Sequence, residues 1–174
     1  AQCQYPNASG ARAAVEHLVA LGHRRIGLLN GPLRSVSARQ REAAWLQALA
    51  DHQLTPHCSL RGDWSAQSGY QALMSQLPDA LPQALLVAND QMALGAMRAL
   101  HRYGVAIPGE ISVIGYDDTA ESAWYQPPLT TVRQDLHYLG AQSVERMLAR
   151  LRGEEVSDAA LETTLVIRET TAPP

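Results

Sequence analysis

Short apolar segments alternate with helical segments along this chain, and four of the apolar segments run directly into a polar or aromatic side chain. These four are RIGLLNG (25–31), SLRGDW (59–64), LLVAND (85–90) and ISVIGYDD (111–118). Strands that alternate with helices are joined by right-handed crossovers, which give a mostly parallel sheet covered on both faces. We therefore predict an α/β fold built on a doubly wound, mostly parallel sheet.

The residues that follow these four strands predict a small-molecule site. In an open parallel sheet, ligands bind outside the carboxyl ends of the strands. The side chains expected to converge on one crevice are Asn30, Asp63, Trp64, Asn89 and Asp117. Taken singly, an Asn or Asp after a strand is also a common turn former or helix N-cap, so a structural role stays open for each.

Helical segments are expected between the strands because apolar residues recur there with a spacing of three and four. The expected helices cover 10–22, 36–53, 65–77, 90–104 and 136–151. Asp90 is the expected N-cap of the fourth helix, and Gly104 suits the left-handed conformation past its end. Two consecutive prolines make 119–128 a long connection, and a last strand is expected within 161–171.

Composition limits the partners of this chain. At 174 residues it is long enough for one globular domain, and its 14 Lys plus Arg against 17 Asp plus Glu give no basic excess for tracking phosphates. We therefore expect no DNA binding by this stretch itself. Cys3 and Cys58 lack metal-ligand spacing, and the default is a reducing compartment, the cytoplasm. No apolar run approaches the roughly 20 residues that cross a bilayer, so no membrane partner is expected. Because the sequence opens without Met, we expect it to begin inside a longer protein.

Catalytic signatures are missing from the sequence. It contains no Walker loop, GxGxxG, GxSxG or HExxH motif, so we predict neither an enzyme nor a cofactor. Asp117 and Asp118 could hold a magnesium ion or accept a phosphoryl group, but a receiver-like site would also need acidic residues after the first strand. Alternatively, one carboxylate accepts hydrogen bonds from a ligand while the other caps or turns toward water. The six histidines lack ligand spacing, and no metal site is predicted.

Four residues have the chemistry that a sugar requires. A sugar presents neighbouring hydroxyl groups, each a donor and an acceptor, above an apolar ring face. Planar carboxylate, amide and guanidinium groups can hold two hydroxyls at once, and an indole can cover the ring. Arg41, Trp64, Asn89 and Asp117 supply this set. The competing interpretation is that Trp64 only fills the core.

Several long blocks, in order and in register, resemble the effector-binding core of the LacI/GalR family of bacterial transcriptional regulators. They are VEHLVALGHRRIGLLNGP, SVSAR, GDWSAQSGY, LVANDQMALGAMRAL, ISVIGYDDT and YQPPLTTVRQD. The resemblance covers nearly the whole chain. It implies a periplasmic-binding-protein-like core of two α/β lobes with the inducer between them, a helix-turn-helix headpiece that reads DNA, and a homodimer as the operator-binding unit.

The resemblance also implies roles for individual residues. Arg41, Asn89 and Asp117 match family positions that hydrogen-bond the sugar, Trp64 matches the indole of the pocket, and Ser37 matches a nearby polar contact. Gln134 falls at the crossover between the lobes. Two pocket positions depart from the resembled pattern, since Tyr5 and Leu136 stand where that pattern has phenylalanine, which changes the expected pocket shape.

The family pattern further implies lobe boundaries and a subunit interface. Residues 5–132 with about 163–171 would form the C-terminal lobe, and 133–162 would belong to the N-terminal lobe. Most of that lobe and the DNA-binding headpiece would lie outside this chain. The implied dimer residues are Leu94, Met97, Leu100, Trp124 and Tyr125, for which core packing is the alternative.

We therefore expect part of a sugar-responsive repressor, in which a galactoside-like inducer between two lobes shifts the protein away from its operator-binding state. A periplasmic sugar receptor has the same fold and crevice and would carry a signal peptide. An enzyme that uses Asp117 and Asp118 would show turnover or metal dependence.

Overall fold

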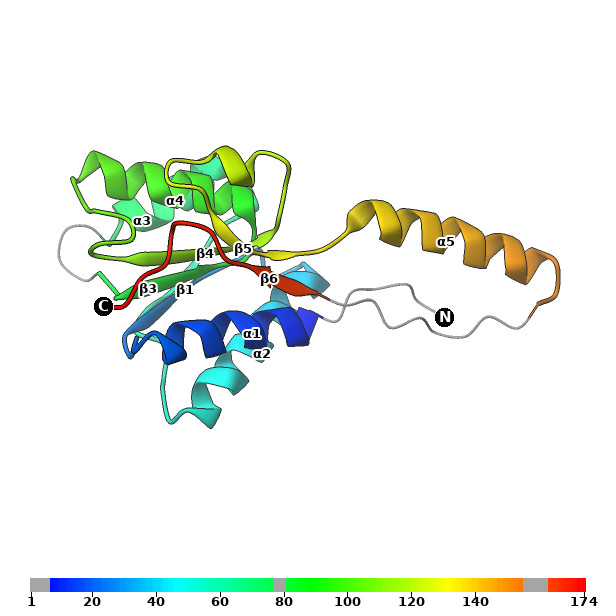
Figure 1. The fold of residues 1–174 in the computed structure, drawn as a ribbon, viewed down its shortest axis with the longest axis horizontal. Coiled ribbons are helices and arrows are strands. Elements are labelled where there is room, and N and C mark those ends of the chain that lie inside the picture. Colours follow the sequence, from blue (N-terminus) through cyan, green and yellow to red (C-terminus); the bar gives the residue numbers. More distant parts are fainter. Residues whose placement is uncertain (1–6, 77–80, 155–162) are drawn as a thin grey trace.

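A six-stranded sheet with two helices on each face forms the body of the molecule (Figure 1). The computed structural model describes residues 7–76, 81–154 and 163–174. The strands are β1 (Ile26–Asn30), β2 (Ser59–Arg61), β3 (Ala84–Val87), β4 (Ser112–Asp117), β5 (Thr130–Arg133) and β6 (Thr164–Val166). They lie in the order β2-β1-β3-β4-β5-β6, and all neighbours are parallel except β5 and β6. The predicted fold class is confirmed.

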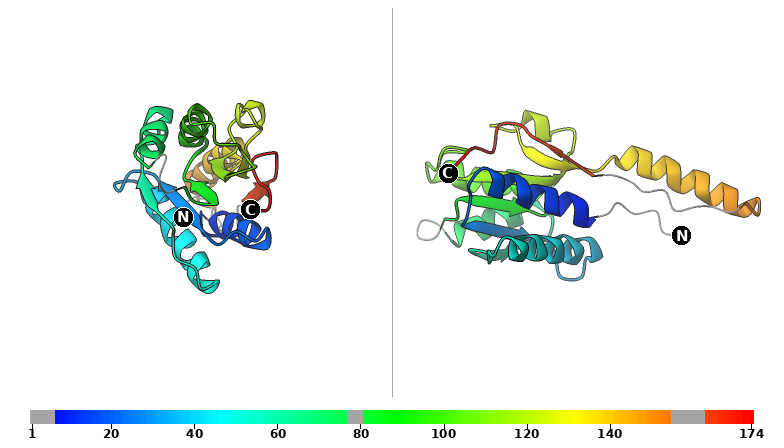
Figure 2. Two further views of the ribbon diagram at one scale, coloured as in Figure 1. Left: turned by 90° about the vertical axis from the view of Figure 1, so that its left-hand side faces the viewer. Right: turned by 60° about the horizontal axis from the view of Figure 1, so that its bottom comes forward.

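The helices divide between the two faces of the sheet (Figure 2). α1 (Asn7–Ala20) packs beside α2 (Val36–Asp51), and α3 (Ala66–Met74) packs beside α4 (Asp90–Arg102) on the opposite face. Every residue of β1 and β3 is buried, as expected for strands covered on both sides. Because these strands are parallel, their carboxyl ends share one edge, which faces α5 (Leu136–Leu151).

The connections explain where sequence-based boundaries were wrong. Asn89, not Asp90, is the N-cap of α4, because its side chain accepts the Met92 amide hydrogen at 2.9 Å. The connection after β4 contains a 3-10 turn, η1 (Ser122–Trp124). The sequence analysis did not predict β5, and the expected last strand shortens to β6.

The two helices α3 and α4 touch through glycines. A Cβ atom on Gly69 would lie 2.2 Å from the Met92 carbonyl oxygen, and one on Gly95 would lie 1.8 Å from the Ala66 carbonyl oxygen. Only glycine allows such an approach of two helix backbones. The pair fixes α4, and with it Asn89, against the end of β2.

α5 stands apart from the body and projects beyond the carboxyl edge of the sheet (Figure 1). Five large hydrophobic side chains on it are exposed, namely Tyr138, Val144, Met147, Leu148 and Leu151. The chain then returns through β6, and residues 170–172 run beside the start of β4, where Thr170 Oγ1 donates to the Val113 carbonyl at 2.6 Å. No helix within the described residues is long and apolar enough to cross a membrane.

Candidate functional site

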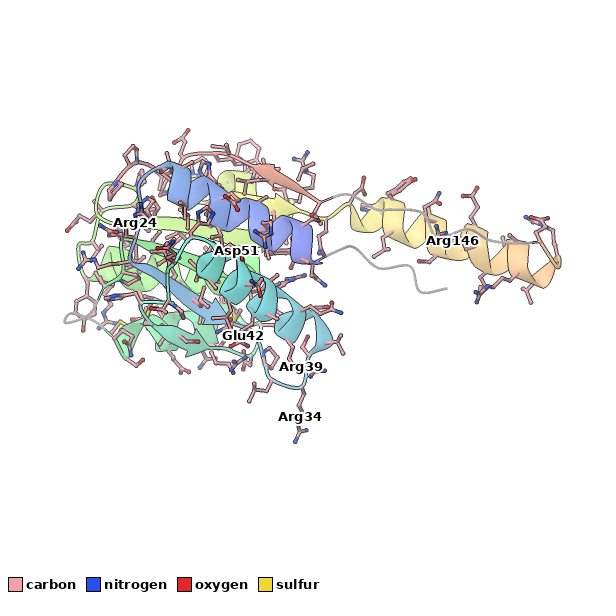
Figure 3. The ribbon with its side chains drawn as sticks, turned by 90° about the horizontal axis from the view of Figure 1, so that it is seen from below. Arg24, Arg34, Arg39, Glu42, Asp51 and Arg146 are labelled. Carbon is pink, nitrogen blue, oxygen red and sulfur yellow. The ribbon has the colours of Figure 1, made fainter. Side chains whose placement is uncertain are left out.

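Arg41 is the central charged group at the carboxyl edge of the sheet. It lies on the buried face of α2, between Ala38 and Trp45, and is 5% exposed. Its Nε donates to Asn7 Oδ1 at 3.0 Å, and its Nη1 donates to the carbonyl oxygen of Ala88 after β3. Arg34, by contrast, lies on the loop before α2 and points away from the body (Figure 3).

The guanidinium of Arg41 pairs with the carboxylate of Asp117 and stacks on an aromatic ring. Arg41 Nη2 donates to Asp117 Oδ1 at 3.1 Å. Its Cζ lies 3.8 Å from the centroid of the Tyr116 ring and 5.9 Å from that of Trp64. Stacking on Tyr116 keeps the guanidinium plane fixed while its edge stays available for hydrogen bonds.

Asp117 is a half-buried carboxylate at the last position of β4. Burial raises its pKa to about 6, although the neighbouring charge of Arg41 opposes the shift. Its backbone has a φ of 114°, and Asp118 and Trp64 also have positive φ values of 57° and 82°. Strained backbone conformations of this kind cluster at ligand sites. Here all three lie at or just after the carboxyl ends of strands β2 and β4.

Trp64 and Asn89 sit side by side on this edge. The Asn89 Nδ2 donates to the Trp64 carbonyl at 3.0 Å, while its Oδ1 caps α4. Trp64 is partly buried, and its ring covers Gly31, where a Cβ atom would lie only 2.5 Å from the ring. Asn89 therefore has the structural role that was left open, and it also holds the loop that carries Trp64.

Asp90 is one of two carboxylates near Asp117 that stabilise the loops around it. Asp90 is fully buried and accepts hydrogen bonds from the Thr119 amide, Ser122 Oγ at 2.6 Å and Thr131 Oγ1 at 2.6 Å. Its pKa is raised because burial outweighs these hydrogen bonds.

The expectation that the second carboxylate of the Asp117–Asp118 pair caps or turns toward water was wrong. The Asp118 side chain is 6% exposed and forms ion pairs of 2.6 Å with both Arg133 Nε and Arg168 Nη2. It therefore fastens β5 and the C-terminal segment together. Among the described residues, no group of three or more His, Cys, Asp or Glu side chains could hold a metal ion.

The other predicted site residues lie at different distances from this centre. Gln134, just after β5, receives a hydrogen bond from Arg41 Nη2 at 3.4 Å. Ser37 lies one helical turn before Arg41 on α2 and is partly exposed. Leu136 begins α5, without a described side-chain position, and Tyr5 lies outside the described residues.

Asn30 and Asp63 do not reach the centre, contrary to the expected convergence. The Asn30 Nδ2 donates to Ser59 Oγ at 3.0 Å and to the Leu60 carbonyl, tying β1 to β2. Asp63 is exposed and accepts hydrogen bonds from the amide and hydroxyl of Ser65 at the start of α3, which lower its pKa to about 2. Both are structural turn or strand-end residues.

Asn7 and Tyr116 are parts of the site that the sequence analysis missed. Asn7 precedes the apolar positions of α1, and Tyr116 was read as one more apolar residue of its strand. Strand alternation gave no signal for Tyr116, because it places the neighbours Tyr116 and Asp117 on opposite faces of β4, whereas both contact Arg41. Nothing in the local sequence of Asn7 indicates its contact with Arg41.

A hollow of about 530 Å³ opens beside Asp117, on the side of β5 and the start of α5. Its lining consists of Asp117, Asp118, Thr119, Ala120, Arg133, Gln134, Asp135 and His137. Arg41, Trp64 and Asn89 do not line it. Asp117 and Gln134 therefore border both the hollow and the Arg41 cluster.

Three of the five expected interface residues are core residues. Met97, Leu100 and Tyr125 are 4%, 0% and 8% exposed and belong to the hydrophobic core. A partner cannot bury them further, so the structure favours core packing for these three. Leu94 and Trp124, at 45% and 85% exposure, are the ones on the surface.

Comparison with known proteins agrees with this architecture. The family model described as a periplasmic binding protein-like domain matches residues 15–171. The chain belongs to this family.

Its relatives in this family are LacI-type repressors, as the sequence blocks indicated. The chain is 51% identical over 172 residues to the lactose operon repressor of Escherichia coli (strain K12), covering 98% of this chain and 48% of that protein. It is 39% identical to the transcriptional repressor PurR of Haemophilus influenzae (strain PittEE), over 82% of this chain and 43% of that one. The chain thus spans about half the length of these curated relatives.

Solved structures show the same similarity. A dimeric lac repressor with an 11-residue C-terminal deletion matches with a TM-score of 0.94 at 50% identity, covering 98% of this chain and 63% of that one. A lac repressor dimer bound to operator and the anti-inducer ONPF matches with a TM-score of 0.93 at 50% identity, covering 97% of this chain and 59% of that one. These relatives are transcriptional repressors rather than enzymes.

Proposed function

We propose that this chain is part of the effector-binding and dimerisation core of a sugar-responsive transcriptional repressor. The observation that carries the proposal is the Arg41–Asp117 pair at 3.1 Å, with the Trp64 indole beside it at the carboxyl edge of the sheet. A buried guanidinium and a half-buried carboxylate offer a donor and an acceptor for neighbouring hydroxyl groups. The indole offers an apolar surface for the sugar ring.

The ligand that fits the cluster of Arg41, Trp64, Asn89 and Asp117 is a galactoside-like sugar. Related lac repressor structures contain ONPF or ONPG, which are sugar derivatives with an aromatic group. Trp64 lies where an aromatic or sugar ring can stack. Asn89 keeps one Nδ2 hydrogen beyond the one that it donates to the Trp64 carbonyl, and this hydrogen is available to a sugar hydroxyl.

Sugar binding changes the affinity of the complete protein for its operator by changing the arrangement of two lobes. We assign residues 5–132 with about 163–171 to one lobe and 133–162 to the second. The exposed apolar face of α5 supports this assignment, because such a face needs a covering partner in the complete protein. A sugar that contacts both lobes shifts the population only by its difference in affinity between their arrangements, typically about 1–3 kcal/mol.

The remaining parts of the proposal follow from the same relatives. The complete protein acts in the cytoplasm as a homodimer and binds operator DNA through a headpiece, without enzymatic turnover or a cofactor. This stretch has a net charge of −3, consistent with DNA contacts located elsewhere. Leu94 and Trp124 are the proposed surface contacts of the dimer.

Titration of the protein produced from its complete gene with ONPG tests the proposal, by calorimetry and by operator binding. Wild-type protein binds the sugar, and saturating sugar changes operator affinity. Arg41→Ala weakens sugar binding by about a hundredfold, because a charge-assisted contact is lost and Asp117 is left without its partner. Arg34→Ala is the matched control and leaves binding unchanged, since Arg34 is exposed on the loop. Sugar binding with no effect on any DNA would favour a periplasmic-type receptor instead.

A further inference from the structure

Asn7 joins two residues of the proposed sugar site through a single oxygen atom. It is the first residue of α1 and is 8% exposed. Its Oδ1 accepts hydrogen bonds from Arg41 Nε at 3.0 Å and from Gln134 Nε2 at 3.3 Å. Its Nδ2 donates in turn to Gln40 Oε1 at 2.8 Å, while the two donors from Arg41 and Gln134 hold its Oδ1 in place.

The backbone of Asn7 contacts Tyr116, the residue on whose ring Arg41 stacks. Its carbonyl oxygen accepts the Tyr116 hydroxyl hydrogen at 3.1 Å, and the Tyr116 ring lies 3.8 Å from Arg41 Cζ. Asn7 therefore fixes the guanidinium edge directly and the ring beneath it indirectly.

These contacts determine which hydrogens of Arg41 remain for a ligand. A guanidinium has five N–H donors. Within the described part of the chain, Nε is used by Asn7, one Nη1 hydrogen by Ala88, and Nη2 by Asp117 and Gln134. One Nη1 hydrogen is left, and its direction is set by how Nε is held.

We propose that Asn7 is a positioning residue for sugar recognition, which orients Arg41 and, through Gln134, ties it to the segment leading into α5. This proposal rests on the proposed function of the site. Gln134 follows β5 and precedes α5, so the Asn7 oxygen links the pocket arginine to the crossover between the lobes. A displacement of that crossover would remove Gln134 from the Asn7 oxygen and from Arg41 Nη2.

A double-mutant cycle in the protein produced from its complete gene tests this role. Asn7→Ala weakens ONPG binding by about tenfold because Arg41 loses its Nε acceptor. In the Arg41→Lys background, which has no Nε donor at that position, Asn7→Ala changes binding by less than about twofold. Asn7→Asp keeps an oxygen at the same place and recovers most of the affinity.

Gln40→Ala is the control for the remaining contact of Asn7. It removes the partner of Nδ2 and leaves Oδ1 and Arg41 in place, so binding stays at the wild-type level. An equal loss from Asn7→Ala in both backgrounds would mean that Asn7 acts only through folding, and would overturn the proposal.

A second measurement does not depend on sugar binding. In protein labelled with ¹⁵N-arginine, the Arg41 Nε–H exchanges slowly with solvent, and Asn7→Ala accelerates this exchange by about tenfold or more. If wild-type protein bound no ONPG, the proposed function would fail while this exchange still decided the role of Asn7. Exchange unchanged by Asn7→Ala would refute positioning even if the sugar bound.

Discussion

At the scale of single residues, the site is determined by burial as much as by charge. Arg41 is enclosed by partners that satisfy most of its donors, whereas Asp117 accepts from Arg41 through Oδ1 and also lines the hollow. Burial raises the pKa of Asp117 to about 6 despite the adjacent Arg41. The Asp117 carboxyl therefore changes its protonation state near pH 6, within the pH range in which binding can be measured.

The affinity for ONPG depends on pH through Asp117. The ionised carboxylate accepts hydroxyl hydrogens, and it becomes protonated as the pH falls through about 6, so the affinity falls by about tenfold for each further pH unit. Calorimetry between pH 7.5 and 5 measures this slope. Asp117→Asn binds weakly at every pH and shows no such slope. A wild-type affinity that is constant over this range would contradict the assignment of Asp117 as the acceptor.

The contribution of Asp117 to the free energy of unfolding changes with pH in the opposite direction from its contribution to sugar affinity. The pKa of Asp117 is higher in the fold than its ordinary value of 3.8, so the fold holds the proton more tightly than the unfolded chain does. This stabilising contribution is complete below pH about 4 and is lost as the pH rises through about 6. Asp117→Asn removes this dependence, and urea unfolding at several pH values measures it.

At the scale of helices and strands, the pattern of the sequence predicted most of the framework but not its exceptions. The buried runs and helical spacing indicated β1 to β4 and the helices correctly. β5 was missed because Thr130 and Thr131 read as polar, although both are fully buried by partners distant in the sequence. The Arg41–Asp117 contact joins positions 76 residues apart, and side-chain chemistry and the resemblance to a family, not local spacing, grouped them beforehand.

The contact of α3 with α4 gives a prediction about stability. Gly95→Ala places a methyl group 1.8 Å from the Ala66 carbonyl oxygen, so the helices must separate, at a cost of about 3 kcal/mol in the free energy of unfolding. Gly140→Ala on α5 is the control, because a Cβ atom there meets nothing within 4 Å. There the change stabilises the helix by about 0.5–1 kcal/mol. Urea denaturation compares the two, and equal effects would refute the role of the close contact.

At the scale of the whole molecule, two exposed apolar surfaces lie on different parts of the chain. Trp124 on η1 and Leu94 on α4 belong to neighbouring segments, because the Tyr125 hydroxyl donates to the Asp90 carbonyl at the start of α4. The other surface is the apolar side of α5, which projects from the body (Figure 1). We assign the first to a second subunit and the second to the other lobe.

Replacing Trp124 by arginine weakens the dimer. An arginine at a position that is 85% exposed does not disturb the core, but it places a charge in an apolar interface. Sedimentation of Trp124→Arg therefore shows monomers at concentrations where wild-type protein is dimeric. Leu46→Arg, on α2 across the sheet, is the control and leaves the dimer intact. An unchanged sedimentation profile for Trp124→Arg would count against this surface as the interface.

The chain of 174 residues alone should bind galactosides only feebly. It supplies Arg41, Trp64, Asn89 and Asp117, but it spans 48% of the E. coli relative, and the opposite wall of the proposed pocket would come from residues outside it. Without that wall the sugar keeps much of its water, and each hydrogen bond competes with solvent. Calorimetry on the isolated chain, with its folding checked by circular dichroism, should give a dissociation constant of about 1 mM or weaker, near 4 kcal/mol of binding free energy. Micromolar binding would show that one lobe is sufficient, and the two-lobe mechanism would then lose its source of differential affinity, because a sugar held by one lobe alone cannot favour either arrangement of the pair.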